Sequence, residues 1–595
     1  MSDLITLDRA GKANGKRGFY DQDWNNFAPN FSVAWSPDFG NNFFGRLFGR
    51  EGKSVVRGGF RMLYDRIGSA LAVNFDLNSQ LGFSASGNAS ANACNQSTSL
   101  CPRLTGLTPN VAAYPGIVLP ASLTFPLTHP TDGGRGRLDT AIDDSLTTPQ
   151  QYTWNLTYGR ELPKGFAFEA SYVGRAARNL LAVRDIMALN NLVDTKSGAD
   201  WYTAAGMLAN LRESNTLITS VQSIPYFENL FPGLAGNYSV NGQTVRLTAT
   251  QAFYRRVARA CVDNKTNNSG QCAIGAIGGR NTTDWTFVQD IFNDSAIVPN
   301  AFYHPQYAAL SAYSTIGSSD YHGATFTLRH RFKNDVAFDF NYTFSKSFDD
   351  TSVLESQVSN SNFLRNSLNL KLSRAVSNFD VRHSFNANWF AALPFGKGKM
   401  LFKGANRALD AAIGGWQLTG IFRMHSGLPI LNGLGGPFEL GTWATNWQIG
   451  SNAVRLRDVQ ADNNPNVADP TGGGAGLRPN IFSDPTAAYR SFRSPRAGEV
   501  GDRNILRMPG YFVIDAGLGK TFNMPYAETH KLQFRWEVFN LTNTQPFGVI
   551  STMGVAQDPY LGSPGADFGR YIDSQKPVGE TRPGRVMQFA LRYIF

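Results

Sequence analysis

An all-β fold dominated by one large antiparallel sheet is predicted by three features of this sequence. Apolar and polar residues alternate with a period of two in many segments, which places one set of side chains on each face of a strand. The gaps between these segments are alternately short and long along the chain. Composition agrees with a sheet, because 17% of the 595 residues are charged while Phe occurs 43 times and Gly 59 times.

The strands in the N-terminal half follow this alternation with varying clarity. Weaker examples fall near residues 31–35 and 56–62, and a clearer one follows at 152–158. The residues that share a face in these three segments are Phe31, Val33 and Trp35; Gly58, Phe60 and Met62; and Tyr152, Trp154, Leu156 and Tyr158. A possible additional strand lies at LITLD near the start of the chain. Each of these segments has the length and pattern of a half-buried strand.

The segment VAFDFNYTFS gives the central example of the pattern. Its apolar face carries Phe338, Phe340 and Tyr342, and the opposite face carries Asp339 and Asn341. Two further strands are expected near residues 385–393 and 416–424, where aromatic and aliphatic residues again occupy every second position.

The C-terminal region predicts the last two strands. In KLQFRWEVFNL one face is apolar, and it consists of Leu532, Phe534, Trp536 and Val538. The other face is polar, and it consists of Lys531, Gln533, Arg535 and Glu537. The final segment RVMQFALRYIF places an apolar set on the face opposite Arg592, namely Met587, Phe589, Leu591, Tyr593 and Phe595. In total about eleven strands are expected, with the possible twelfth at LITLD.

The connections favour a membrane barrel over a soluble sandwich. Transmembrane barrels alternate short periplasmic turns with long external loops, and a sandwich has no reason to do so. The long gaps are roughly 66–150, 175–320, 349–381, 428–510 and 544–584. The short ones are roughly 37–53, 163–165, 333–335, 396–413 and 523–529. No run of about 18 apolar residues predicts a membrane helix. We therefore expect an antiparallel transmembrane outer-membrane β-barrel, with about 11–12 strands present and long extracellular loops.

Several segments together resemble the Oar-like TonB-dependent receptors of acidobacterial type. They are NNFAPNFSVAWSP (25–37), VRGGFRMLYDRIG (56–68), SNFDVRHSFNANWFAALPFGKGK (377–399), GGWQLTGIFRMHSGLPI (414–430), EVFNLTNTQPFG (537–548) and GRVMQFALRYIF (584–595). The resemblance implies an outer-membrane receptor that binds a nutrient, of unknown identity, at its extracellular loops for uptake driven by the TonB complex. Outer-membrane adhesion or surface interaction by the same barrel, without active transport, is the alternative. A soluble secreted carbohydrate binder is a third and weaker possibility.

The resemblance also implies which parts of such a receptor residues 1–595 represent. They correspond to the C-terminal part of the barrel, and the signal peptide, the plug and the N-terminal half of the barrel are expected to be absent. The residues after Met1, SDLITLDRAGKANGKRG, have no apolar core of signal-peptide length, which agrees with this expectation. Contact with TonB would then depend on regions missing here. A second interpretation is that twelve strands close into a barrel by themselves.

The C-terminal strand resembles the signal by which barrel proteins are recognised for insertion. Its alternating residues Phe589, Leu591, Tyr593 and the terminal Phe595 are the expected recognition element, which implies the barrel assembly machinery as a partner. The formal net charge is +10, but Lys and Arg are scattered rather than gathered in one arm. Contact with outer-membrane lipid and lipopolysaccharide explains this charge better than nucleic acid does.

The four cysteines form two local pairs in polar stretches assigned to the exterior. Cys94 is therefore expected to join Cys101, and Cys261 to join Cys272, because an oxidising compartment favours disulfides. Neither pair has the spacing of a zinc site.

Catalytic, cofactor and metal sites are not expected. The seven His are dispersed and lack a matched nucleophile or carboxylate at diagnostic spacing. The polar-face residues near the middle and end of the chain have two open interpretations: they line a solute path, or they form ion pairs inside a wide barrel. These candidate lumen-lining residues are Asp339, Asn341, Gln533, Arg535, Glu537 and Arg592.

Overall fold

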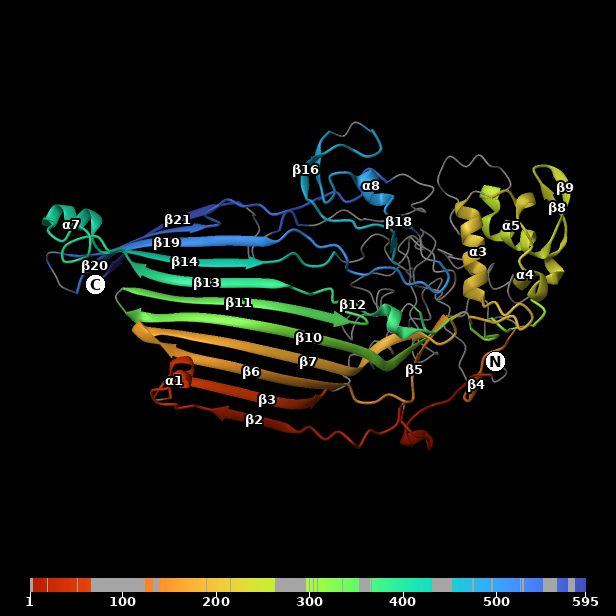
Figure 1. The fold of residues 1–595 in the computed structure, drawn as a ribbon, viewed down its shortest axis with the longest axis horizontal. Coiled ribbons are helices and arrows are strands. Elements are labelled where there is room, and N and C mark those ends of the chain that lie inside the picture. The colour runs from red at the N-terminus through yellow and green to blue at the C-terminus, as the bar shows by residue number, and fades with distance from the viewer. Residues whose placement is uncertain are drawn as a thin grey trace, which may run out of the picture.

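The fold is a large antiparallel sheet with a layer of folded connections at one end, as seen in a computed structural model (Figure 1). The structure describes residues 4–595 apart from 66–123, 132–137, 263–295, 353–363, 431–451, 549–563 and 576–583, and apart from positions 19, 51, 189, 215, 299, 303, 308, 334, 365, 474–475, 494–495, 525 and 527–528.

Eleven strands form the main path of the sheet, and each pairs with the next one along that path. They are β2 (Asn30–Trp35), β3 (Ser54–Tyr64), β6 (Gln150–Leu162), β7 (Phe166–Asp185), β10 (Ala309–Lys333), β11 (Val336–Asp349), β13 (His383–Ala392), β14 (Trp416–His425), β19 (Tyr511–Asn523), β20 (Lys531–Phe539) and β21 (Val586–Ile594). All ten pairings along this path are antiparallel. The all-β antiparallel fold predicted from the sequence is confirmed.

Two further strands join the sheet beside this path. β5 (Leu138–Ile142) pairs in parallel with β10, and β12 (Ala375–Val376) pairs with β11. Within the described residues β2 and β21 pair with nothing on their outer edges, so the sheet is open there.

The prediction of a possible twelfth strand at LITLD was wrong for this sheet. The segment contains only β1 (Thr6–Leu7), which pairs with β4 (Leu127–Thr128) in a separate two-stranded sheet. The side chain of Gln306 holds this segment in place: its Oε1 accepts from Ile5 N at 2.7 Å and its Nε2 donates to Ile5 O at 3.1 Å. The segment is therefore bound to the connection after β7 and to β4, and it does not pair with the edge of the main sheet.

The predicted alternation of short and long connections is present. At one end of the sheet the connections are short, and they contain α1 (Phe43–Phe48), η5 (Pro163–Gly165) and α7 (Arg407–Ile413). All long connections lie at the other end (Figure 1). One gap was predicted too long, since β7 and β10 continue well into the expected 175–320 gap. Register shifts around Gly317 break the two-residue alternation there, which hides the strand in the sequence.

The connection between β7 and β10 forms a helical unit that the sequence analysis did not predict. We call it the external module, and its elements are α3 (Trp201–Glu213), η6 (Ile218–Ser220), α4 (Pro225–Leu230), η7 (Pro232–Leu234), β8 (Gly236–Val240), β9 (Gln243–Leu247) and α5 (Ala249–Val262). Its core is rich in fully buried aromatic rings, including Trp201, Tyr226, Phe227, Phe231 and Phe253. Among the described helices, none is long and apolar enough to cross a membrane.

A second core joins the connection after β14 to the connection after β20. It is built from Ile481, Phe482, Tyr489, Phe568 and Tyr571, together with smaller apolar residues. The short elements of these connections are α8 (Pro485–Tyr489), β15 (Val454–Arg455), β16 (Asn464–Val467), β17 (Arg478–Asn480) and β18 (Phe492–Arg493). Two short 3₁₀ segments lie elsewhere, η1 (Lys12–Asn14) and η8 (Leu370–Ser373). The long connections thus have their own hydrophobic cores, separate from the sheet.

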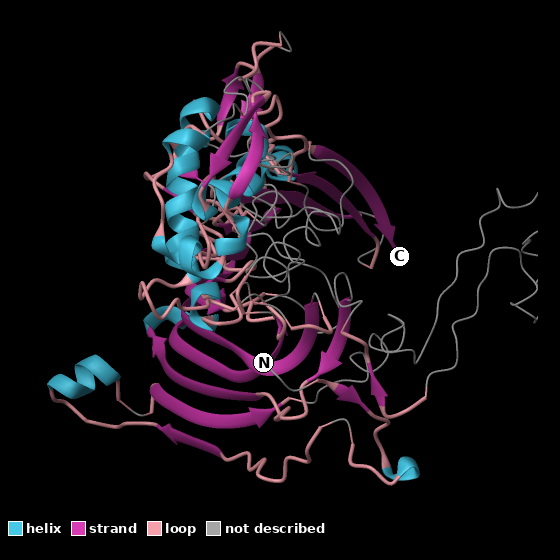
Figure 2. Ribbon diagram, turned by 90° about the vertical axis from the view of Figure 1, so that its right-hand side faces the viewer, coloured by secondary structure: helices cyan, strands magenta, loops and turns pink. Residues whose placement is uncertain are grey.

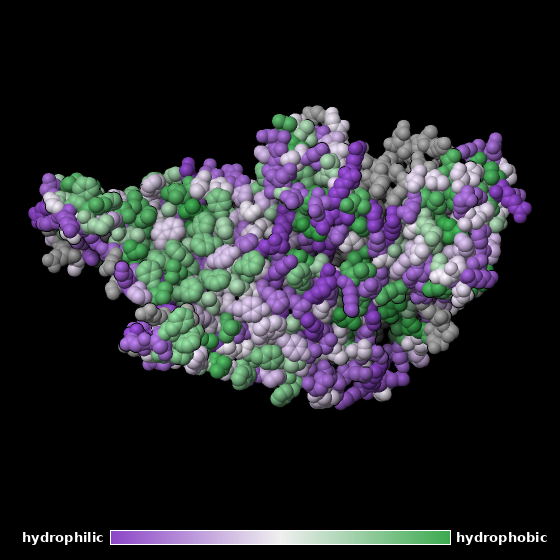
Figure 3. Space-filling view, viewed as in Figure 1, coloured by the Kyte–Doolittle hydropathy of each residue, from purple (hydrophilic) through white to green (hydrophobic). Residues whose placement is uncertain are grey.

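The two faces of the sheet differ in chemistry along its whole width. Figure 2 looks roughly along the strands and shows that the sheet is curved, and Figure 3 shows apolar side chains covering its outward face. Two glycines make room for large rings on this face, because a Cβ at Gly174 would lie 2.2 Å from the Trp154 ring and one at Gly420 would lie 2.1 Å from the Trp389 ring. The outward face therefore consists of interlocking aromatic and aliphatic side chains.

Candidate functional site

The polar face of the sheet brings together the residues predicted to line a lumen. Cross-strand register places Asp339 opposite both Arg329 and Asn388. Near the C-terminus it pairs Gln533 with Arg592 and Glu537 with Gln588. The six candidate residues Asp339, Asn341, Gln533, Arg535, Glu537 and Arg592 all lie on this face. The aromatic residues at the intervening positions point to the other face, and Phe589 and Leu591 are 66% and 68% exposed there.

Several charges on the polar face have a partner of opposite sign. Arg329 Nε lies 2.9 Å from Asp339 Oδ2, and Asn341 Nδ2 donates to Asp339 Oδ1 at 2.6 Å. Arg535 Nη2 lies 2.5 Å from Glu537 Oε1. Such half-exposed pairs each stabilise a fold by about 1 kcal/mol or less. Asp339, Arg535 and Glu537 are therefore in ion pairs, while the role of the six residues in lining a solute path stays a prediction.

A cavity of about 610 Å³ lies on the polar face in the middle of the sheet. Residues of β10, β11, β13, β14, β19 and β20 line it, and the polar ones among them are Arg329, His330, Asp339, Asn388, Thr419, Asp515 and Glu537. Among the described residues, no three His, Cys, Asp or Glu are grouped so as to hold a metal ion. The paired charges and hydroxyls suit weak, reversible contact with a polar solute.

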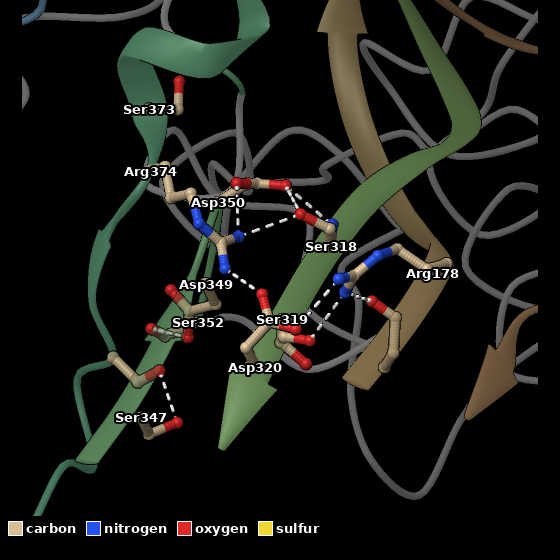
Figure 4. Close-up of polar contacts among 12 residues, drawn as sticks. Arg178, Ser318, Ser319, Asp320, Ser347, Asp349, Asp350, Ser352, Ser373 and Arg374 are labelled. Carbon is tan, nitrogen blue, oxygen red and sulfur yellow. Dashed lines mark hydrogen bonds and ion pairs between the residues drawn. The ribbon is translucent and has the colours of Figure 1, made fainter. Parts of the chain in front are cut away.

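A second polar cluster lies at the end of the sheet that carries the long connections (Figure 4). Arg374 contacts Asp320 and lies 3.3 Å from Asp350 Oδ1, while Arg178 Nη2 lies 2.9 Å from Asp320 Oδ1. Ser318 Oγ accepts from Arg374 Nη1 at 2.9 Å and donates to Asp350 Oδ2 at 2.7 Å. This cluster fastens the connection after β11 to β7 and β10.

Two buried ion pairs fasten the connection after β14 to the same place. Arg503 Nη2 lies 2.6 Å from Asp349 Oδ1, and Arg507 contacts Asp380, whose side chain is almost completely buried. Asn504 Nδ2 adds a hydrogen bond to Val376 O at 2.7 Å. Removing one partner of such a buried pair costs about 3–5 kcal/mol. These contacts hold the connection after β14 against the end of β11 and the segment around β12.

We call these two groups of contacts, from Arg178, Asp320 and Arg374 to Arg503 and Arg507, the rim. Sequence reasoning did not find it. Its charged residues lie at strand ends and in loops, where no two-residue period or motif marks them. The only available signal was the pair Asp349-Asp350 directly after a predicted strand.

In the external module one carboxylate organises the turn before α3. Burial alone would raise the pKa of Asp194, but hydrogen bonds from Ser197, Asn229 and two backbone amides outweigh that effect and lower the pKa to about 2. A carboxylate that accepts this many hydrogen bonds stays ionised at neutral pH.

The disulfides Cys94–Cys101 and Cys261–Cys272 stay predictions. Cys94, Cys101 and Cys272 lie outside the described residues, and only the backbone of Cys261 is described, within α5.

The arrangement of faces defines the class of protein. A curved antiparallel sheet with aromatic side chains outward and paired charges inward is suited to hydrocarbon on one side and water on the other. The sequence matches the family described as "Outer membrane beta barrel domain" over residues 4–588, and the chain therefore belongs to this family. It lies in the bacterial outer membrane. The short connections are then periplasmic and the long ones external.

Solved structures of outer-membrane transporters are similar to this chain at low sequence identity. The outer membrane transporter YddB from Escherichia coli is 8% identical with a TM-score of 0.33, and the similarity covers 95% of this chain and 40% of that one. The ferric enterobactin receptor PfeA from Pseudomonas aeruginosa is 10% identical, with a TM-score of 0.31 and coverage of 96% and 40%. The FrpB iron transporter from Neisseria meningitidis is 10% identical with a TM-score of 0.30, and the similarity covers 95% of this chain and 39% of that one.

The chain spans about 40% of the length of these three proteins. A search of curated protein sequences finds no significant match.

Proposed function

We propose that this chain is the wall-forming part of an Oar-like TonB-dependent receptor of acidobacterial type, which binds a nutrient at its external layer and passes it inward along the polar face. The observation that carries the proposal is the continuous polar face, which runs from the external rim at Asp349 past the cavity at Asp339 to the periplasmic end at Gln533 and Arg592. Charged and hydroxyl-bearing side chains along this face would give a polar solute many weak contacts and no high-affinity binding site.

We propose further that residues 1–595 form the C-terminal part of a larger barrel. Ten successive antiparallel pairings make β2 and β21 run in the same direction. Pairing these two edges with each other, or with the edges of another copy in the same membrane, would therefore be parallel. An antiparallel closure needs an odd number of additional strands, and strand edges cannot stay unpaired in lipid. The plug and the segment that contacts TonB would belong to the same missing part.

Surface adhesion without transport is the second candidate function. The observation that favours it is the external module, whose aromatic core forms a compact folded unit outside the membrane. An adhesin would present such a unit and would not depend on the polar face.

Transport measurements distinguish these functions. Residues 1–595, exported to the outer membrane of a host, should show no TonB-dependent accumulation of candidate nutrients, whereas the receptor completed with its barrel, plug and TonB contact should. In planar bilayers the completed receptor without its plug should conduct, and Arg535→Glu should shift its ion selectivity toward cations. Trp536→Phe, on the outward face of the same strand, is the matched control and should change nothing. Energy-dependent uptake by residues 1–595 alone, or unchanged selectivity in Arg535→Glu, would contradict the proposal.

A further inference from the structure

The outward face of β7, β10 and β11 changes in chemistry toward its external end. In the apolar band Phe326 and Phe344 are exposed. Closer to the external end, His322 and Lys346 lie directly opposite each other on β10 and β11. Tyr172 on β7 lies opposite Ala324, one step closer to the apolar band, and its hydroxyl lies 2.7 Å from His322 Nδ1. Apolar side chains thus give way to tyrosine, histidine and lysine within one step of the strand pleat.

The next row outward consists of charged residues held in a fixed arrangement. Arg178, Asp320 and Arg374 form the network described above, and Arg374 brings the η8–β12 segment against the sheet (Figure 4). The side chains of Arg178 and Arg374 are still 43% and 34% exposed. The network therefore positions cations at the surface without burying them.

The η8 segment adds a cation and apolar side chains next to this row. Lys371 is exposed, and so are its neighbours in sequence Leu368 and Leu372. In the described part of the chain neither Lys346 nor Lys371 takes part in an ion pair. Lys346 Nζ instead lies 4.6 Å from the centre of the Phe348 ring. Both ammonium groups are therefore available to an external anion.

The charge of this region is positive. We define the basic rim patch as Arg178, His322, Lys346, Lys371 and Arg374. Its four Arg and Lys side chains face two carboxylates, Asp320 and Asp350, which leaves two positive charges with His322 neutral. The surface in Figure 3 accordingly passes from apolar over the sheet to mixed and polar toward the external layer.

Within the other described strands, the outward positions at the external end carry no Arg or Lys, but the exposed Arg585 lies directly before β21. The residues in the corresponding outward positions are Met62, Tyr152, His383, Met424, Phe512, Val538 and Met587. Among the described strands, outward Arg and Lys near the external end are thus found within β7 and β11, at Arg178 and Lys346.

We propose that the basic rim patch binds the phosphorylated headgroup of an outer-leaflet lipid, with the acyl chains lying on the apolar band below it. Cations directly above an apolar surface match an anionic lipid, which has its phosphate and its hydrocarbon in the same order. A free anion would not contact the exposed apolar side chains of Phe326, Phe344 and Leu372, whereas the acyl chains of a lipid would. The inference depends on the location in the outer membrane and not on the proposed uptake function.

Lipid retention by the purified full chain tests this inference. The chain is reconstituted with bisphosphorylated lipid A, monophosphoryl lipid A or phosphatidylcholine, and the lipid that stays bound is measured by native mass spectrometry. The wild type should retain bisphosphorylated lipid A most tightly. Lys346→Gln with Lys371→Gln should weaken this binding by about fivefold for each lysine removed. Lys397→Gln with Lys403→Gln removes the same charge at the periplasmic end and should change it less than twofold.

Three results would overturn the inference. One is equal retention of lipid A by the wild type and the Lys346/Lys371 variant, with unchanged circular dichroism showing that both are folded. Another is equal retention of phosphatidylcholine and lipid A by the wild type. The third is lysine-dependent binding of inorganic phosphate alone with the same affinity, which would make the patch a site for free anions.

Discussion

The sheet and the external module differ in the burial of their large apolar side chains, which are exposed on the sheet and buried in the module. In the sheet, Phe589 and Leu591 are more than half exposed, and charged residues such as Asp339 occupy the other face. In the external module, Trp201 and Phe253 have no exposed surface and pack among other buried aromatic rings. The difference follows from the surrounding medium, because hydrocarbon accepts an aromatic side chain that water would drive into a core. In one chain, large apolar side chains thus face outward in the membrane part and inward in the part beyond the rim.

The largest expected effect is in the core of the external module. Trp201→Ala should destabilise this module by about 3–5 kcal/mol, since it leaves a large cavity among Tyr226, Phe227 and Phe253. Hydrogen exchange of α3 and α5 measures the loss. The matched change Trp35→Ala, at an exposed ring on β2, should cost less than about 1 kcal/mol. Equal losses of stability from the two substitutions would contradict the difference in burial between the module and the sheet.

A charge placed on the outward face should have the next largest effect. Phe340→Arg should destabilise the inserted sheet by about 2–4 kcal/mol, because the guanidinium would lie in hydrocarbon. Asn341→Arg, the neighbouring position on the polar face, should cost less than about 1 kcal/mol. Unfolding by denaturant in lipid vesicles measures both. A larger loss for Asn341→Arg would mean that the faces are assigned the wrong way round.

The smallest expected effect concerns Asp194 and pH. Its pKa falls from 3.8 to about 2 on folding, so its ionised form stabilises the external module above about pH 4. This contribution should disappear as the pH falls from about 4 to about 2. Asp194→Asn should cost about 1–3 kcal/mol at neutral pH and remove this part of the pH dependence. Trp201 fluorescence during acid titration provides the measurement, and an unchanged profile in the variant would exclude Asp194 as the cause.

The sheet was largely predictable from the sequence, and the external layer was not. Residues 531–538 alternate strictly because each faces either lipid or water, so the pattern itself reveals the strand. The strand beyond Arg175 was missed because Gly317 and the register shifts around it interrupt the alternation of its partner. In the external module, α3 and α5 are short helices whose apolar residues come together only through tertiary contacts between segments far apart in sequence.

The polar face and the rim were predictable to different degrees. Asp339 and Arg535 were found because they occupy the polar positions of strong strands. Arg503 and Arg507 pair with Asp349 and Asp380 across more than a hundred residues of sequence, and no local pattern marks such a pair. Strand faces follow from a local rule, whereas the rim depends on how distant loops meet.

The alternation of short and long connections also bears on how such a chain can change in evolution. The gap between β14 and β19 is many times longer than the gap between β19 and β20, yet both join neighbouring antiparallel strands. Each doubling of a flexible loop adds only about 0.6 kcal/mol to the cost of closing it. An insertion at the external end therefore leaves the pairing of the sheet almost untouched, while the same insertion in the Lys333–Val336 turn would separate two strands that are held together by a tight reversal. New recognition surfaces can accumulate at one end of the protein while the part in the membrane stays the same.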